Sequence, residues 1–197
     1  MPYVTKPMPQ CSIVDTNAKL TAAIVAPLTA AGYAGVARYV PLPNNNAGSD
    51  IDAVELSALV EGGLGVILVQ HVRLPGWNPA QCSGAADAAT AIKYAKAAGY
   101  LAQGHIFLDL EGIGGTAAAT LQYANDWANA VAAANYQAGC YVGFDVPLSA
   151  QQLYEDLKNI NSYWSAEGDY SVAVRGFAIR QHATVEVQGI GRRPGLC

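Results

Sequence analysis

The sequence predicts an α/β fold, a compact TIM-like (β/α) barrel whose last third is poor in helices. Five strand-helix units follow one another up to about residue 160, and this order is typical of a parallel sheet with right-handed crossovers. The segment 64–70 is apolar on both faces, as a buried parallel strand requires. Three short strands then follow without room for full helices. Eight strands can close a barrel, so we expect one domain over residues 1–197. An open doubly wound sheet is the alternative.

The first three strands and the two helices between them are marked by their ends. Apolar residues at helical spacing stop at Gly32 and at the pair Gly62-Gly63, and glycine commonly ends helices. Asp50 or Asp52 can cap the second helix by accepting a hydrogen bond from its unpaired N–H groups. We therefore expect, in chain order, strand 11–15, a helix from 17 to 31, strand 35–40, a helix from about 52 to 61, and strand 64–70.

The following units repeat this form before the spacing shortens. Gly99 stops one helix, and Thr116 caps an alanine-rich helix whose inward stripe includes Trp127. Ser149 introduces a further helix that we expect to run through Ile160. The expected elements are helix 85–98, strand 105–111, a helix from 117 to about 131, strand 138–144, a helix to 160, and strands 162–165, 176–181 and 184–187.

Composition excludes several classes of protein. Hydrophobic residues make up 52% of the chain and charged residues 13%, which is typical of a globular protein with a large core. The net charge is −4 and Lys and Arg do not cluster, so we expect no nucleic-acid partner. No apolar run reaches the ~20 residues of a membrane span. Residues 1–10 contain no apolar signal-peptide core. We expect a monomer without an integral membrane segment.

Metal and cofactor chemistry find little support in the sequence. The four cysteines match no metal motif, and we expect Cys140 to be a core thiol because it lies inside an apolar strand. A disulfide between Cys11 and Cys197 is a hypothesis that requires the chain ends to meet. His105 begins its strand, away from the acids at the other end, so we expect no metal site. The glycines after Glu111 lack the order of a phosphate-binding loop, and we expect no cofactor.

Two carboxylates stand at the end of the apolar strand 105–111. Side chains alternate across a strand, so Phe107, Asp109 and Glu111 share one face. The Cα atoms of the two acids should lie roughly 6.5 to 7 Å apart, close enough for each carboxyl to perturb the protonation of the other. The sequence therefore predicts an acid pair at a strand exit.

Other polar and aromatic residues follow the exits of the remaining strands. In a barrel these exits face a common mouth, where chemistry is usually found. Carboxylates can carry out general-acid hydrolysis, aromatic rings can stack on sugars, and amides or Arg can bind hydroxyls. The mouth therefore suits a sugar polymer. The candidates beside Asp109 and Glu111 are Asp15, Arg38, Tyr39, Gln70, Trp77, Tyr141, Asp145, Trp164, Gln181 and Glu186.

A structural interpretation competes with this catalytic one. Asp109 and Glu111 would then mark the exposed end of a strand, or cap the helix that begins near Thr116. Trp77 and Trp164 would then be packing residues rather than platforms for sugars. A lone D-x-E after apolar residues is a weak motif, so the functional interpretation depends on the surroundings of the pair.

The order of these elements resembles the bacterial glycoside-hydrolase-like domains of unknown function, which are relatives of the family 25 muramidases. The resemblance covers about residues 11–188 and is carried by the order of the elements rather than by one motif. It implies a (β/α) barrel with a helix-poor end that acts on peptidoglycan or a related glycan. The residues that carry it are Asp15, Arg38-Tyr39, Val66–Gln70, Gly84, Asp87-Ala88, Ala91, Gly99 and Ile106–Glu111.

The resemblance also implies roles for three acids. Glu111 matches the acid that protonates the leaving oxygen, Asp109 the carboxylate that positions or stabilises the reacting sugar, and Asp15 the acid at the mouth of the first strand. Ile13-Val14 stands where the family often has Gly-Phe, and Glu186-Val187-Gln188 where it usually has Asp-x-Asn. The departure at Glu186 concerns the position of the family's fourth acid. The sequence therefore does not specify which group activates the attacking water.

Two hypotheses of different classes follow. The first is a glycosidase, a peptidoglycan-cleaving muramidase similar to lysozymes and endolysins, which acts outside the cytoplasm and is secreted or released by a phage. The second is a barrel that binds a wall glycan without cleaving it, or serves as a structural domain. The altered segment at Glu186 favours the second hypothesis. Hydrolysis of another polysaccharide is a third alternative.

Overall fold

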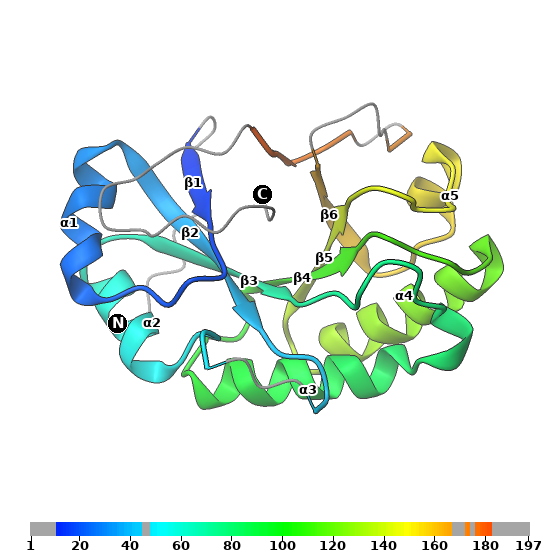
Figure 1. Ribbon diagram of the computed structural model, residues 1–197, viewed down its shortest axis with the longest axis horizontal. Coiled ribbons are helices and arrows are strands. Elements are labelled where there is room, and N and C mark those ends of the chain that lie inside the picture. Colours follow the sequence, from blue (N-terminus) through cyan, green and yellow to red (C-terminus); the bar gives the residue numbers. More distant parts are fainter. Residues whose placement is uncertain (1–10, 45–47, 167–171, 174–175, 183–197) are drawn as a thin grey trace.

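The fold is a parallel sheet of seven strands that curls into a half-barrel, with helices along its outside (Figure 1). The computed structural model describes residues 11–44, 48–166, 172–173 and 176–182. The strands are β1 (Ser12–Asp15), β2 (Tyr33–Val40), β3 (Gly65–Gln70), β4 (His105–Leu110), β5 (Gln137–Val142), β6 (Ile160–Ser165) and β7 (Ile179–Arg180). The helices are α1 (Ala22–Ala30), α2 (Ala53–Glu61), the 3-10 turn η1 (Pro79–Gln81), α3 (Gly84–Ala97), α4 (Ala117–Ala133) and α5 (Ala150–Glu155).

Each strand of the sheet pairs in parallel with its neighbours in the chain, in the order β1 to β7. A doubly wound sheet would reverse its strand order at one point, so this order rules out the open doubly wound alternative. The predicted α/β class and parallel sheet are confirmed. The predicted eighth strand, residues 184–187, lies outside the described residues, and the closed barrel stays a prediction.

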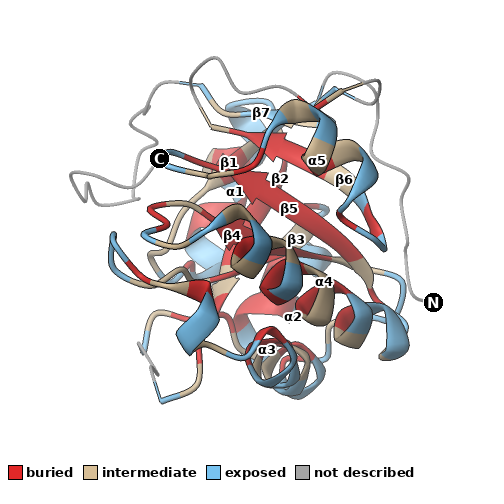
Figure 2. Cartoon of the chain, turned by 90° about the vertical axis from the view of Figure 1, so that its right-hand side faces the viewer, coloured by how far each residue is buried: buried red, intermediate tan, exposed pale blue. Residues whose placement is uncertain are grey.

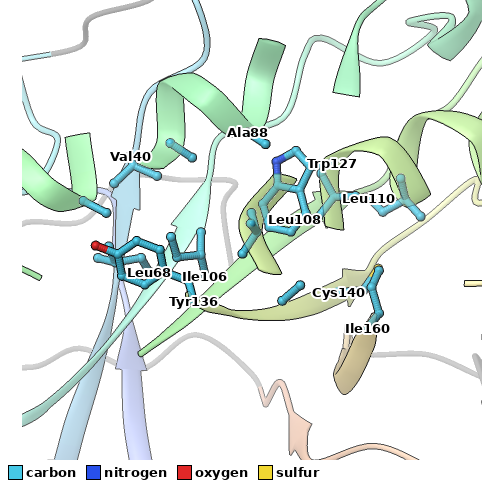
Figure 3. Close-up of a cluster of buried hydrophobic side chains, with 14 of the residues drawn as sticks. Val40, Leu68, Ala88, Ile106, Leu108, Leu110, Trp127, Tyr136, Cys140 and Ile160 are labelled. Carbon is cyan, nitrogen blue, oxygen red and sulfur yellow. The ribbon is translucent and has the colours of Figure 1, made fainter. Parts of the chain in front are cut away.

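The main core lies between the sheet and the helices. Apolar side chains from one face of every strand from β1 to β6 pack there against α1 to α5. Figure 2 colours the buried residues of these elements, and Figure 3 shows part of this core. The alternate residues of β4 belong to it, namely Ile106, Leu108 and Leu110. Trp127 of α4 is fully buried in this core, and its indole N–H donates to Gln70 Oε1 over 2.6 Å. We call this helix-covered side of the sheet the outer face.

The opposite side of the sheet, the inner face, has its own small apolar cluster. Ala37, Val69, Phe107, Tyr141 and Trp164 meet there, one from each of the strands β2 to β6. Phe107 lies in this cluster while its neighbours in β4 lie in the main core, so the alternation predicted for this strand is confirmed.

Helix caps agree with the sequence in most places. Thr116 and Ser149 cap α4 and α5, and Ser149 forms a capping box with Gln152. Of the two acids considered for α2, Asp52 is the cap, since its side chain accepts from Glu55 N.

Two boundaries near the end of the chain differ from expectation. The last predicted helix ends at Glu155, and Ile160 begins β6 instead of closing that helix. Asn159 has a φ of 60° immediately before the strand, a left-handed conformation that breaks a helix. The strand expected over 176–181 is only the two-residue β7. Among the described residues, no helix combines the length and the apolar character needed to cross a membrane.

Candidate active site

Three carboxyl groups gather at the carboxyl ends of β1 and β4. Asp15 is the last residue of β1, and Asp109 and Glu111 belong to β4 and the residue after it. Asp109 has an exposed fraction of only 8%, whereas the other two acids are partly exposed. Strand pairing brings β1 and β4 together through β2 and β3, so the curl of the sheet brings acids distant in sequence onto one inner face.

Burial raises the pKa of all three acids, and repulsion from neighbouring carboxylates adds to the shift at Asp109 and Glu111. Burial raises the pKa of Asp15 to about 6, although a hydrogen bond from Tyr39 opposes the shift. Burial, followed by the charges of Glu111 and Asp15, holds the pKa of Asp109 well above its ordinary value. Burial and the charge of Asp15 also raise the pKa of Glu111. The cluster can therefore hold protons at a pH where exposed carboxyls would be ionised.

Tyr39 lies close enough to the acids of β1 and β4 for the charges of Asp15 and Asp109 to act on its phenol. Its hydroxyl donates to Asp15 Oδ2 over 3.4 Å. Burial and then the charges of Asp15 and Asp109 raise the pKa of this phenol, so it stays a hydrogen-bond donor. The ring stacks on His71 with centroids 4.7 Å apart, and His71 Nε2 lies 2.7 Å from Asp50 Oδ1. This pair fixes the position of the Tyr39 ring.

Some buried oxygens of the acids have no hydrogen-bond partner among the described residues. They are Oδ1 of Asp15, Oδ1 of Asp109 and, behind His71, Oδ2 of Asp50. Buried polar atoms without partners are uncommon in folded proteins, because burial without a hydrogen bond is costly. On the inner face, Asp15 and Asp109 therefore have hydrogen-bonding capacity that a ligand could use.

Glu111 is held by close packing against the end of β5. Its side chain lies against Gly143, where a Cβ atom would stand 2.2 Å from Glu111 Oε2 and 2.5 Å from Glu111 Cβ. Gly143 N donates to Leu110 O over 3.0 Å, and Gly112 N donates to Phe144 O over 2.8 Å. Gly112 has a φ of 62°, which turns the chain immediately after the acid.

The loop between β3 and α3 fixes the backbone of Glu111 from the other side. Trp77 donates its indole N–H to Glu111 O over 2.9 Å, and Trp77 O accepts from Gly114 N over 2.8 Å. Its ring meets Tyr123 edge-on at 5.1 Å and lies 5.6 Å from the Arg73 guanidinium carbon. Trp77 is buried in the main core, which gives it a packing role.

A partly buried ion pair supports Trp77 in turn. Arg73 donates to both oxygens of Asp87, over 2.7 and 3.0 Å, and the Tyr123 hydroxyl donates to Asp87 Oδ2 over 2.6 Å. Asp87 belongs to α3 and Tyr123 to α4. The two helices are therefore joined to the loop that holds the acid.

Aromatic and amide side chains lie on the inner face beyond Glu111, on β5, on β6 and directly after β7. Tyr141 and Trp164 are opposite one another in the β5–β6 register, with ring centroids 5.2 Å apart in an edge-on arrangement. The Tyr141 hydroxyl donates to Gln181 Oε1 over 2.9 Å. The structure thus brings these three predicted residues together on the same face as the acids.

Arg38 and Gln70 are not brought to this site. Both are fully buried on the outer face. Arg38 Nε donates to Glu55 Oε1 over 2.6 Å, and its other nitrogens donate to backbone carbonyls. Gln70 Nε2 donates to Pro41 O and Asp87 O over 3.0 and 2.7 Å. Their hydrogen bonds to the protein explain their burial, so we do not retain them as glycan-binding residues.

The other predicted residues have diverse positions. Asp145 is exposed in the loop after β5, with a φ of 51°. Glu186 lies outside the described residues. His105 begins β4, at the end of the inner face away from the acids, where its ring nitrogen lies 3.3 Å from Ser162 Oγ. Within the described ranges, no group of three or more His, Cys, Asp or Glu side chains is arranged to hold a metal ion.

The cysteines follow the sequence expectation where the structure describes them. Cys140 is a fully buried free thiol, and burial raises its pKa. Cys11 is exposed. The hypothesis of a bridge from Cys11 concerns Cys197, which lies outside the described residues.

Sequence reasoning missed Gly143 and the pair formed by His71 and Asp50. The role of Gly143 depends on the β4–β5 register, which a single sequence does not give. The only sequence signal that His71 could belong to the site was its position directly after a predicted strand. The complete site contains three acids with raised pKa values, a phenol, two further aromatic rings and an amide. Its acids can donate and accept protons in general acid-base chemistry.

Comparisons with known proteins identify the family. The Rv2525c-like, glycoside hydrolase-like domain matches residues 26–191. None of the curated proteins compared matches the chain. Similar solved structures include the Mycobacterium tuberculosis Tat-secreted protein Rv2525c in complex with L-tartrate, at a TM-score of 0.67 and 16% identity over 91% of each chain. Its complex with HEPES gives a TM-score of 0.65 and 15% identity over 91% of each chain.

Another similar structure is that of an uncharacterized B. stearothermophilus protein. Its TM-score is 0.62 and its identity 16%, over 93% of this chain and 82% of the other. At such identities these structures show a shared fold and nothing more. The domain match, in contrast, spans most of the sequence, including the segments that carry Asp109 and Glu111. The chain therefore belongs to the family of Rv2525c-like, glycoside hydrolase-like domains.

Proposed function

We propose that this protein is a glycosidase that cleaves peptidoglycan as a muramidase, related in mechanism to the family 25 muramidases, with Glu111 as its general acid. The observation that carries the proposal is the cluster of Asp15, Asp109 and Glu111 on one inner face, each with a raised pKa. Glycoside hydrolysis uses paired carboxyl groups of which one is protonated. The family, a glycoside hydrolase-like domain, supports the same chemistry.

The three acids divide the chemistry between them in this proposal. Glu111 is partly exposed and has a raised pKa, so it can carry a proton to the glycosidic oxygen as the bond breaks. Asp15, with a pKa of about 6, is mostly ionised at neutral pH and stabilises the positive charge that develops on the sugar. Asp109 remains neutral and donates a hydrogen bond that positions the sugar.

The polymer and the place of action are part of the same proposal. The related protein Rv2525c is Tat-secreted, and we propose that this chain also acts outside the cytoplasm, on the cell wall, as a monomer. Tyr39, Tyr141, Trp164 and Gln181 would bind the glycan beside the acids. Asp145 and Glu186 stay candidates for more distant contacts.

Glu111→Gln tests the function directly. Glutamine keeps the shape of the side chain but cannot deliver a proton, so release of reducing ends from purified peptidoglycan should be lost, with the melting temperature nearly unchanged. Glu61→Gln, at the exposed end of α2, is the matched control and should retain full activity. Retained activity in Glu111→Gln would remove the assignment of the acid.

A second candidate function is glycan binding without cleavage. The observation that favours it is the sequence Glu186-Val187-Gln188, which departs from the Asp-x-Asn that the family usually has at this place. A pull-down on insoluble peptidoglycan, compared with a turbidity assay on the same material, separates the two functions. Binding with no fall in turbidity would favour the second candidate, and mass spectrometry of released fragments would identify the bond if cleavage occurs.

A further inference from the structure

Two buried hydrogen-bond donors on the inner face have no acceptor among the residues that the structure describes. They are Nε1 of Trp164, on β6, and Nε2 of Gln181, directly after β7. A buried N–H group nearly always has a partner in a folded protein, since burial without one is unfavourable. Two such donors in one region indicate that a ligand supplies the acceptor.

Strand register brings the two donors to the same region of the sheet. Trp164 is opposite Ile179 in the β6–β7 register, and Gln181 N donates to Ser165 O over 2.9 Å. Gln181 follows Ile179 by two residues, so both belong to the same face of β7 and its continuation. Tyr141 contacts both donor residues, through its ring to Trp164 and through its hydroxyl to Gln181.

The contact with Tyr141 also orients the amide. The phenol donates to Oε1 of Gln181 over 2.9 Å, so the carbonyl end of the amide is occupied and the NH2 end is the one that can serve a ligand. The indole of Trp164 is held edge-on between Tyr141 and Phe107, with centroids 5.2 and 6.0 Å away. The two donors are therefore fixed by contacts within the protein.

The surroundings determine which acceptor fits. Asp15, Asp109 and Glu111 gather on the same face, and the ionised carboxylate of Asp15 would repel an anionic ligand. A neutral carbonyl oxygen meets no such repulsion. The apolar neighbours of Trp164, which include Phe107 and Ile179, suit a small apolar group such as a methyl. The acetamido group of an N-acetylated sugar, CH3–C(=O)–NH–, combines such a carbonyl with a methyl group.

We propose that Trp164 and Gln181 form a subsite for the acetamido group of an N-acetylated sugar. The donors would bind its carbonyl oxygen, and the aromatic rings would enclose its methyl group. The place of this sugar next to the acids rests on the proposed function, in which Glu111 cleaves the adjoining bond. The subsite makes the N-acetyl group, rather than the pyranose ring alone, the feature that the protein recognises.

Calorimetric titration of the full chain tests the proposal. The probes are the tetramer of N-acetylglucosamine and the tetramer of glucose, which are both neutral and differ in the acetamido group. The Glu111→Gln variant serves as the background, so that turnover does not disturb the titration. We expect this background to bind the acetylated tetramer about tenfold or more tightly than the glucose tetramer.

Two variants remove the donors separately. Gln181→Glu keeps an oxygen for the Tyr141 hydroxyl and loses the NH2 group, and Trp164→Phe keeps a ring and loses the N–H group. Each should weaken binding of the acetylated tetramer by roughly 3- to 10-fold and leave binding of the glucose tetramer unchanged. Gln137→Glu, the same change at the opposite end of the inner face on β5, is the control and should alter neither affinity.

The results separate this proposal from the proposed function. Equal binding of both tetramers by the background, or equal weakening of both by the two variants, would overturn the subsite whatever the enzymatic activity. If Glu111→Gln still hydrolyses peptidoglycan while acetyl selectivity depends on Trp164 and Gln181, the subsite stands and the assignment of the acid fails. If Gln181→Glu and Trp164→Phe bind like the background, the subsite fails alone.

Discussion

Asp15 carries a charge that the folded protein disfavours. Its pKa rises from 3.8 to about 6 on folding because the carboxyl is buried. Between these two values the folded chain binds a proton that the unfolded chain has released, so the stability of the protein falls as the pH rises from about 4 to about 6. The acid thus lowers stability at neutral pH, a common price of a functional site.

Asp15→Asn should therefore stabilise the protein at neutral pH. Asparagine keeps an acceptor for Tyr39 and removes the buried charge, so the free energy of unfolding at pH 7 should increase by about 1 to 3 kcal/mol. The gain should shrink as the pH falls to 4, where the wild-type carboxyl is protonated in the folded state. Urea unfolding at several pH values measures this, and Asp156→Asn, at an exposed position, is the control. A gain that does not vary with pH would contradict the assignment.

Gly143 determines where the side chain of Glu111 can lie. A methyl group at this position would overlap the carboxyl of Glu111, with a separation of 2.2 Å from Oε2. Gly143→Ala should therefore displace the acid and reduce peptidoglycan cleavage about tenfold or more. Gly65→Ala, where the added Cβ would stay 3.5 Å from its nearest neighbour, should leave cleavage unchanged. Full activity in Gly143→Ala would show that Glu111 is not the acid.

Residue-level prediction succeeded where alternation within one strand was sufficient. The apolar residues of β4 indicated the face on which Asp109 lies. At the exit of β2, Arg38 and Tyr39 were both candidates, although neighbours in a strand point to opposite faces. The partner that holds Arg38 on the outer face is Glu55 in α2, and nothing in the sequence between them specifies that contact.

At the scale of elements, the loop after β3 positions the acid through the indole of Trp77. The hydrogen bond from Trp77 Nε1 to Glu111 O joins this loop to the end of β4, and Arg73 and Asp87 connect the same loop to α3. The contacts that hold the acid therefore extend beyond the strand that carries it, because a loop and two helices, α3 and α4, together support one backbone carbonyl.

Trp77→Phe should lower the rate of cleavage while most of the packing remains. Phenylalanine cannot donate to Glu111 O, so we expect kcat to fall by roughly 3- to 10-fold with KM little changed. Trp127→Phe is the matched control, since it also removes an indole hydrogen bond, to Gln70, but on α4 away from the acids. Both variants should melt at lower temperature, and only Trp77→Phe should lose activity. Equal loss of kcat in both would assign Trp77 a purely structural role.

Element prediction was accurate where helix signals were local and less so near the end of the chain. Thr116 and Ser149 mark their helices because a cap depends on residues three positions apart. Ile160 fits the apolar spacing of the helix before it equally well, yet it begins β6 and pairs with Ala138 of β5. That pairing joins residues far apart in the sequence, and the periodicity of apolar residues within one helix cannot predict it.

For the whole molecule, the strand order predicts an uneven distribution of stability. Strands β2 to β6 each have a hydrogen-bonded neighbour on both sides, and β3 to β5 are the central ones, whereas β7 is only two residues long. Amide hydrogen exchange should therefore be slowest in β3, β4 and β5 and faster in β1 and β7. Mass spectrometry of peptides after exchange in native buffer measures this order. Exchange in β4 as fast as in β1 would contradict it.

The overall class was predictable because alternating strands and helices leave few arrangements of a parallel sheet. The closed barrel stays a prediction, because closure depends on how the last strands meet the first, and the residues expected to form the eighth strand lie outside the described ranges. The proximity of Asp15 and Asp109 on the inner face also depends on contacts between distant strands. It follows from the curvature of the sheet, which no local sequence pattern specifies.

The sequential strand order also has a consequence for biosynthesis. Each strand from β2 to β7 pairs with the strand translated just before it, so the sheet can form in step with translation. The acid cluster is different, because Asp15 leaves the ribosome long before Glu111 and meets it only after β2 and β3 have been added. A nascent chain therefore has no assembled cluster of acids until the fourth strand has emerged.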